Sequence, residues 1–416
     1  MRLLVLGLLE LVLGVFWGFV WSVYSKSLVD SGFNGFSYGL LGLAMSIATF
    51  TAYFAGSLAY YTRLGGFVMP ISALCLGLSY YMLYNRSFIE LTPITIGLAL
   101  GGHTVSTIRT SSQLTSGNPR LMAFIYSLSL IGFSLGALAV AIGYHLNPLY
   151  VLPLSLVAGL TYRGVQEGLY GGGKPQFYRG LFYAMRSSLW FIVTSLILGV
   201  AGGLTLYNID YYIVSVYNAG EYEVALMLAS SGLLAILAST TLTHLVKSDW
   251  STYAKLILAQ ALIIAILPLV RDVGGVIAVY VGGKTISVIA DAVFDSMYTR
   301  APPLHLVEFR IPVILASWEL SQGLGKMIGS ELLHVDPTTT IVIGSMLMIV
   351  YGILALTLGD RKNTGKPAFT MTPEITMEDI KGIRGAIRQV AIKNRSLSST
   401  LLLIRRLRGK PQRFKV

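Results

Sequence analysis

The sequence is poor in cysteine and in charge. Cys75 is the single cysteine among 416 residues, which excludes intrachain disulfides and cysteine-ligated metal clusters. Only 12% of the residues are charged, whereas 54% are hydrophobic, and soluble domains carry roughly 25% charged residues. The phosphate-loop pattern Gly-x4-Gly-Lys-Ser/Thr is absent as well, so nothing in the sequence predicts an ATP-driven protein. The composition is that of a protein embedded in a lipid bilayer.

Metal and nucleic-acid sites are not predicted either. The five histidines are scattered along the chain without the spacing of a metal site, and no cofactor is expected. The net charge of +12 does not indicate a nucleic-acid partner, because the basic residues fall mainly in short polar segments and at the C-terminal end.

Long apolar segments dominate the sequence, and a spanning helix needs about 20 mostly apolar residues. We expect an all-α membrane protein with two six-helix halves, 1–162 and 188–359, joined by a cytoplasmic connector, 163–187, and followed by a tail, 360–416. Residues 3–23 contain Glu10 and several aromatic residues, and they are predicted to be the first spanning helix rather than a cleaved signal. The twelve expected spans are 3–24, 36–61, 66–84, 91–112, 121–144, 148–162, 188–213, 222–246, 253–269, 273–294, 312–333 and 339–358.

Lysine and arginine predict the orientation, because they are enriched in cytoplasmic loops. With the N-terminus inside, the outer loops hold only Lys26, Arg86 and Arg271. Both termini are therefore expected in the cytoplasm, with the chain in the cytoplasmic membrane. The inner loops would hold Arg63, Arg120, Arg163, Lys174, Arg179, Arg186, Lys247, Lys255, Arg300 and Arg310.

The tail combines apolar residues at helical spacing with a basic end, as in Leu397, Leu401 and Ile404 beside Arg405 and Arg406. Basic amphipathic helices of this type bind anionic lipid at membrane surfaces. The alternative is a solvated tail that ends in a run of charge.

Two short segments of the first half return in the second half. Gly101–Ile108 resembles Gly282–Ile289 at a shift of 181 residues (282 − 101), with His103 opposite Lys284. Leu13–Gly18 resembles Leu198–Gly203 at a shift of 185 residues (198 − 13). Two matches at nearly one offset predict a duplicated half, and parallel duplication is one way in which transporters are built.

Two parallel six-helix halves, a cytoplasmic connector and buried charges resemble the major facilitator superfamily. In that family the first, fourth, seventh and tenth helices line a central cavity, and both repeated segments fall on these helices. The family signature Gly-x-Leu-Ala-Asp-Arg-x-Gly-Arg-Arg is partly present, since Gly56, Leu58 and Ala59 match. Tyr60 and Tyr61 replace the Asp-Arg pair and Arg63 comes late, so the acidic partner of the family's cytoplasmic latch is missing. The resemblance implies a monomeric transporter.

Ionisable residues inside spanning segments usually face a cavity or a partner. We expect a polar site at the bilayer midplane, where Lys284 attracts an anionic group and Glu10, Glu319 or His103 exchanges a proton. Lys326 lies seven residues after Glu319, on nearly the same helix face. The alternative is that Glu10, Glu319, Lys284 and Lys326 form structural salt bridges and that His103 is merely hydrogen-bonded.

Charged residues at helix ends are the candidates for gates. Lys26 and Asp210 occupy nearly equivalent outer positions, and Arg109 and Asp291 nearly equivalent inner ones. We expect an outer latch Lys26–Asp210 and an inner latch Arg109–Asp291, with Asp295 as a further acceptor. The alternative is ordinary snorkelling of these side chains to the membrane interface.

These observations predict a secondary active transporter that moves a small polar or anionic organic solute by alternating access, coupled to protons or another ion. An exporter of lipophilic, drug-like compounds is the alternative, favoured by Trp17, Trp21 and Trp190. A membrane enzyme such as a lipid-linked sugar transferase would need a pair of acidic residues in a sizeable outer loop. The predicted outer loops are short, and the first of them contains only Asp30, so no enzyme is expected. A membrane scaffold or sensor without transport activity is the alternative from another class.

Overall fold

The computed structural model describes residues 2–62, 64–115, 119–167, 174–238, 241, 246–247, 249–300 and 307–362. Residues Met1–Arg361 form one compact unit and Lys362–Val416 another, and the account below concerns the first. Arg63 of the signature, residues 168–173 of the connector and residues 363–416 of the predicted tail lie outside the described residues.

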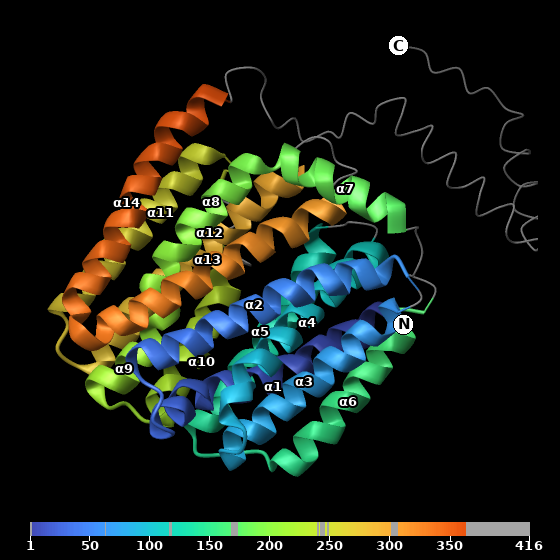
Figure 1. The fold of residues 1–416 in the computed structure, drawn as a ribbon, viewed down its shortest axis with the longest axis horizontal. Coiled ribbons are helices and arrows are strands. Elements are labelled where there is room, and N and C mark those ends of the chain that lie inside the picture. The colour runs from blue at the N-terminus through green and yellow to red at the C-terminus, as the bar shows by residue number, and fades with distance from the viewer. Residues whose placement is uncertain are drawn as a thin grey trace, which may run out of the picture. The chain divides into compact units, whose positions relative to one another are not determined.

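The described part of the chain consists of helices, with no strand among them (Figure 1). Each of the twelve apolar segments expected from the sequence is largely helical. The helices of the first half of the chain are α1 (Arg2–Asp30), α2 (Gly35–Tyr60), α3 (Gly65–Asn85), η1 (Ile89–Leu91), α4 (Thr92–Leu114), α5 (Pro119–Ala141) and α6 (Pro148–Val165). They are followed by α7 (Lys174–Ser187), α8 (Leu189–Leu204), η2 (Leu206–Asn208), α9 (Ile209–Tyr217), α10 (Glu221–Leu237), α11 (Trp250–Ile264), η4 (Leu267–Leu269), α12 (Val273–Arg300), α13 (Val307–Val335) and α14 (Pro337–Lys362).

Several helices begin at residues whose side chains satisfy the free N–H groups of the first turn. Asn147 accepts from the Leu149 amide at the start of α6, 2.9 Å away. Asp249 accepts from the Thr252 amide at the start of α11, at 2.7 Å. The short polar stretches between the apolar segments therefore fix where the helices start.

Among the described residues, seven helical stretches are long and apolar enough to cross a membrane, and an eighth candidate is bent. The eighth consists of Gly180–Ser187 and Leu189–Leu204, which meet at an angle of 71°. The seven straight candidates are Arg2–Asp30, Gly35–Tyr60, Gly65–Asn85, Phe124–Ala141, Trp250–Leu269, Val273–Met297 and Pro337–Thr357.

The expected span 188–213 is not one continuous helix. α8 ends at Leu204, Thr205 has a non-helical backbone with φ −124° and ψ −98°, and the chain resumes as η2 and α9. No proline causes this break. The Asn208 side chain instead donates to the Lys326 carbonyl of α13 at 3.1 Å, which holds the broken segment against that helix.

Glycines let two helix pairs approach at matching positions. α1 packs on α5 and α8 packs on α13. A Cβ atom at Gly18 would lie 2.7 Å from the Ala137 amide nitrogen, and one at Gly203 would lie 2.7 Å from the Lys326 amide nitrogen. These contacts are too short for any side chain. Gly18 and Gly203 are separated by the 185 residues of the sequence repeat (203 − 18), so the repeated glycines also pack in the same way.

The other repeated segment begins at the same place in each helix. Gly101 is nine residues after the first residue of α4 (101 − 92), and Gly282 is nine residues after the first residue of α12 (282 − 273). Across the middle of the chain, α2 packs on α13 and α5 packs on α10. The two halves of the sequence are therefore in contact, and α1 and α9, which carry candidate gate residues, also touch.

Candidate functional site

The first group of buried polar side chains surrounds Glu10 of α1, whose exposed fraction is 1%. His103 of α4 lies with its Nε2 3.0 Å from Glu10 Oε2. On the other carboxylate oxygen, Thr107 donates at 2.6 Å and the Tyr162 hydroxyl donates at 3.0 Å. Two helices, α4 and α6, thus direct three polar groups at one buried carboxylate of α1.

Trp17 determines the tautomer of His103. The indole Nε1 donates to His103 Nδ1 at 3.0 Å, and the two rings stack with an interplanar angle of 10°. Because an indole N–H can only donate, Nδ1 must be unprotonated. His103 is therefore neutral and carries its proton on Nε2, from which it donates to an ionised Glu10.

The second group lies on the helices of the second half. Lys284 of α12 has its Nζ 4.8 Å from the centre of the Tyr207 ring, and Lys326 of α13 has its Nζ 5.9 Å from the centre of the Trp21 ring. Glu319 of α13 interacts electrostatically with both lysines. Within the described residues no carboxylate forms an ion pair with either lysine. Both ammonium groups rest on aromatic faces instead.

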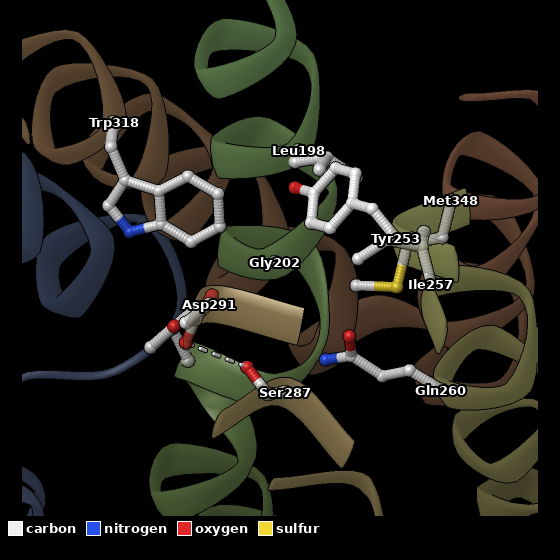
Figure 2. A pocket seen from close by; sticks show the side chains of 10 residues that line it. Leu198, Gly202, Tyr253, Ile257, Gln260, Ser287, Asp291, Trp318 and Met348 are labelled. Atoms are coloured by element: carbon white, nitrogen blue, oxygen red, sulfur yellow. Dashed lines mark hydrogen bonds between the residues drawn. The ribbon is translucent and has the colours of Figure 1, made fainter. Parts of the chain in front are cut away.

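A small cavity lies beside this second group, between α8, α11, α12, α13 and α14 (Figure 2). Its volume is about 20 Å³, which is enough for one water molecule and too little for an organic solute. Ser287 donates to Asp291 at 3.3 Å on its polar wall, and the Gln260 amide faces them. The remaining walls are aromatic or apolar, formed by Leu198, Gly202, Tyr207, Tyr253, Ile257, Trp318 and Met348.

The structure does not form the predicted outer latch between Lys26 and Asp210. Lys26 pairs with Asp30, four residues along the same helix, at 2.9 Å, and Arg86 joins the same carboxylate at 2.9 Å. Asp210 accepts from the Ser25 hydroxyl at 2.5 Å. The contact between α1 and α9 that we expected at this end therefore exists, but a neutral donor makes it and Lys26 does not.

Two tyrosines reinforce this contact between α1–α2 and α9. Tyr38 of α2 bonds to the Ser25 hydroxyl at 2.8 Å and stacks on Tyr211 of α9, with ring centres 4.4 Å apart. The Gly35 amide donates to the Tyr211 hydroxyl at 2.5 Å. We call Ser25, Tyr38, Asp210 and Tyr211 the distal seal, because they join the helices at the end opposite to Arg2.

The predicted inner latch is not formed as an ion pair of Arg109 with Asp291. The Arg109 guanidinium lies over the rings of Tyr60 and Tyr61, 5.2 and 4.9 Å from their centres, and Asp291 instead contacts Ser287. Tyr61 also stacks on Phe309 of α13, with ring centres 5.6 Å apart. The tyrosines that replace the family's Asp-Arg pair thus hold Arg109 and reach α13. Asp295 lies one turn beyond Asp291 on α12, where its charge acts on the Tyr126 side chain of α5.

Among the five predicted midplane residues, the structure brings Glu10 into direct contact with His103 and places Lys284, Glu319 and Lys326 in a separate group. Trp17, Thr107 and Tyr162 were not predicted as members of the site. For Trp17 a signal existed, because it lies seven residues after Glu10 and hence on the same face of the helix. Nothing in the sequence alone indicated that Tyr162 of α6 would reach the same carboxylate.

Comparisons with known proteins find similarity in structure only. No protein-family model matches the chain, and no curated protein matches its sequence. A crystal structure of the nucleoside transporter NupG has a TM-score of 0.58 at 13% identity, over 86% of this chain and 98% of that chain.

Two further transporters are similar over nearly their whole length. A bacterial homologue of the human drug peptide transporters PepT1 and PepT2 has a TM-score of 0.54 at 12% identity, over 86% of this chain and 96% of that one. The human organic anion transporter MFSD10 has a TM-score of 0.53 at 13% identity, over 83% and 99%. The chain therefore has the fold of the major facilitator superfamily transporters.

Proposed function

We propose that the chain is a secondary active transporter that moves a small polar or anionic organic solute across the cytoplasmic membrane. Transport would proceed by alternating access and would be coupled to protons. The fold supports this proposal, since the similar structures are those of a nucleoside transporter, a homologue of drug peptide transporters and an organic anion transporter. A fold can serve several functions, so the substrate must be argued from the site.

The observation that carries the proposal is that Lys284 and Lys326 form no ion pair among the described residues, although Glu319 is near enough to act on both. An ammonium group inside a bilayer is costly, and it is normally paired or faces an aqueous cavity. Lys326 has an exposed fraction of only 8%. A carboxylate or phosphate on the solute would supply the missing partner, and the faces of Tyr207 and Trp21 hold the two ammonium groups in place until it binds.

Coupling to protons is supported by the balance of charge in the two groups. Four carboxylates lie in or beside them, those of Glu10, Asp210, Asp291 and Glu319, against the two lysines. An anionic solute would add to this surplus of negative charge. One or more protons bound to the carboxylates would offset it, and they would travel with the solute or against it.

Alternating access would require two halves that move as units. We propose twelve spans in two pseudo-symmetric six-helix halves, with both termini in the cytoplasm and the tail at anionic lipid. The helices at all twelve expected segments and the matching glycine contacts at Gly18 and Gly203 support this layout. The distal seal and the contact of Tyr61 with Phe309 would then be the gates on the two sides, with Asp210 and Arg109 as their charged members.

The first experiment is thermal unfolding of the purified protein against a library of organic solutes at pH 5 and pH 7.5. A ligand that binds only the folded state raises the midpoint by mass action, by about 2.7 kcal/mol at a hundred times its dissociation constant. We expect organic anions to stabilise the wild type and Lys255→Ala, in which an exposed lysine of α11 is removed. They should not stabilise Lys284→Ala. Equal stabilisation of both variants would contradict the role of Lys284.

The cavity favours a second candidate, an exporter of lipophilic cations. It is lined by Tyr207, Tyr253 and Trp318 with the carboxylate of Asp291 on one wall, and an acidic aromatic pocket suits a lipophilic cation. The same library separates the two functions. Stabilisation by lipophilic cations alone, lost in Asp291→Asn, would establish the exporter.

A scaffold or sensor remains the candidate from another class. Deletion of residues 365–416 separates it from a transporter, since a transporter should keep its flux and a sensor should lose its output. Stabilisation by no member of the library would favour the sensor.

A further inference from the structure

Trp17 connects the two polar groups of the protein. Its indole holds His103 of the first group, and Trp21 lies one turn further along the same face of α1, against Lys326 of the second group. Trp17 thus contacts the first group and Trp21 the second, one helical turn apart on α1. A displacement of Trp17 would therefore be transmitted to the surroundings of Lys326.

The hydrogen bonds around His103 make Trp17 sensitive to a proton. The imidazole has one lone pair, on Nδ1, and the Trp17 N–H occupies it. A second proton on His103 can bind only at Nδ1, and the resulting N–H would face the indole N–H, so two donors would point at each other. Protonated His103 must lose its bond to Trp17, while its Nε2–H remains bonded to Glu10.

We propose that the Glu10–His103 pair is the proton-binding site of this protein, and that Trp17 is the positioning residue that reports its occupancy to Lys326 through Trp21. Proton uptake converts neutral His103 and ionised Glu10 into an imidazolium–carboxylate pair. The proton binds to Nδ1, and no other covalent bond forms or breaks in these side chains. The Trp17 indole loses its hydrogen bond to Nδ1 and turns away. This inference deepens the proposed proton coupling by naming the residues that carry it.

The side chains around His103 other than Glu10 are weak acids or a strong base. On the helices packed around it they include Tyr53 and Tyr60 of α2, Cys75 of α3, Tyr126 of α5 and Tyr162 of α6, with Arg109 on α4 itself. Free tyrosine and cysteine side chains titrate at about pH 10 and 8.5, and arginine above about 12. The His103 side chain has an exposed fraction of 11%, which gives water a route to the ring.

The test uses the full chain labelled with 5-fluorotryptophan, whose five tryptophans give five fluorine signals assigned by single Trp→Phe variants. During a titration from pH 8 to pH 5, the Trp17 and Trp21 signals should shift together with one midpoint. The signals of Trp190 and Trp250, which pack on each other, should stay fixed and report that the protein remains folded. His103→Gln should abolish both shifts.

Two variants separate this proposal from its competitors. Trp17→Phe keeps an aromatic ring and removes the N–H that the second proton would face, so the Trp21 signal should lose most of its pH-dependent shift. Glu10→Gln removes the anion beside the imidazolium, so the midpoint should fall. If Glu10→Gln abolishes the Trp17 shift and His103→Gln leaves it intact, the proton binds to Glu10 alone and the proposal is wrong.

A Trp17 signal that stays constant with pH would also overturn the proposal. The outcome is independent of the proposed function, because no solute is present in the titration. A pH-dependent Trp17 signal in a protein that no solute stabilises would leave this inference standing and refute the transporter. A Trp17 signal that does not change with pH, in a protein that anions stabilise, would refute this inference and support the transporter.

Discussion

Two glycines at close helix contacts, Gly18 and Gly203, allow a sharp test of the duplicated architecture. A methyl group at Gly18 would lie 2.7 Å from the Ala137 nitrogen, and a methyl group at Gly203 would lie 2.7 Å from the Lys326 nitrogen. Ordinary contacts of this kind are about 3.5 Å or longer. Because the obstructing atoms belong to the backbone, a whole helix must move by nearly 1 Å in each case.

We expect Gly18→Ala and Gly203→Ala each to lower the free energy of unfolding by about 1–3 kcal/mol, the usual effect of overpacking. Gly164→Ala is the matched control, because Gly164 is exposed on α6 and a Cβ there meets nothing within 4 Å. An alanine at such a helical position should stabilise by about 0.5–1 kcal/mol. Thermal unfolding in detergent should therefore separate the control from the other two by several degrees.

The repeated segments on α4 and α12 should not behave alike. A Cβ at Gly101 would lie 2.6 Å from the Thr49 carbonyl oxygen, whereas one at Gly282 meets only the Ile263 side chain at 3.9 Å. Gly101→Ala should destabilise the protein and Gly282→Ala should not. If Gly18→Ala and Gly203→Ala unfold at the same temperature as Gly164→Ala, the helix contacts are not as close as described, and the structural support for the duplication is lost.

Two further changes test polar contacts outside the midplane groups. Tyr60→Phe removes the hydroxyl that accepts from the buried Gln166 amide at 2.7 Å and donates to Ser106 at 2.8 Å. The loss of both buried hydrogen bonds should lower stability by about 1–3 kcal/mol, although Thr110 still accepts from the Gln166 amide; an unchanged unfolding midpoint would contradict this. Asp336 begins α14 and accepts from the Thr339 amide and hydroxyl, and these hydrogen bonds lower the pKa of its carboxyl. Its contribution to stability is therefore present above about pH 4, the ordinary value for an aspartate, and disappears as the pH falls through the lowered pKa. Asp336→Ala should unfold below the wild type at pH 7, and the two midpoints should converge in acid.

Much of the helical architecture could be predicted from the sequence because apolar length alone signals a spanning helix. The position of the break at Thr205 could not, since no proline marks it and the preceding Gly202 and Gly203 are as typical of close helix packing as of a bend. The break depends on Asn208 finding the Lys326 carbonyl of α13, a contact that exists only after the helices pack. The α7 helix within the connector was missed because its composition is that of a polar link.

For the candidate site, too, the sequence predicted individual residues but not the contacts between them. Sequence reasoning identified Glu10 and His103 separately, because each is ionisable within an apolar segment, but it could not show that they meet. The partner of Lys26 could have been predicted from the sequence, because Asp30 lies four residues later and residues at this spacing face each other on a helix. The sequence repeat suggested Asp210 as the partner instead. In the structure the Asp210 carboxylate accepts a hydrogen bond from Ser25, the residue before Lys26.

The charged side chains of the first polar group have more hydrogen-bond and ion-pair partners than those of the second. This difference suggests that the first group binds the proton and the second binds the solute. Glu10 receives three hydrogen bonds and is sealed from solvent, so an organic solute would have little to add there and only a proton could alter it. Lys284 and Lys326 rest on aromatic faces and lack a carboxylate partner among the described residues, so a solute anion would gain most at that group. A carrier in which one half binds the ion and the other binds the solute needs a link between them. α1 supplies that link, because it carries Glu10, Trp17 and Trp21 and thus contacts both groups along a single rigid helix.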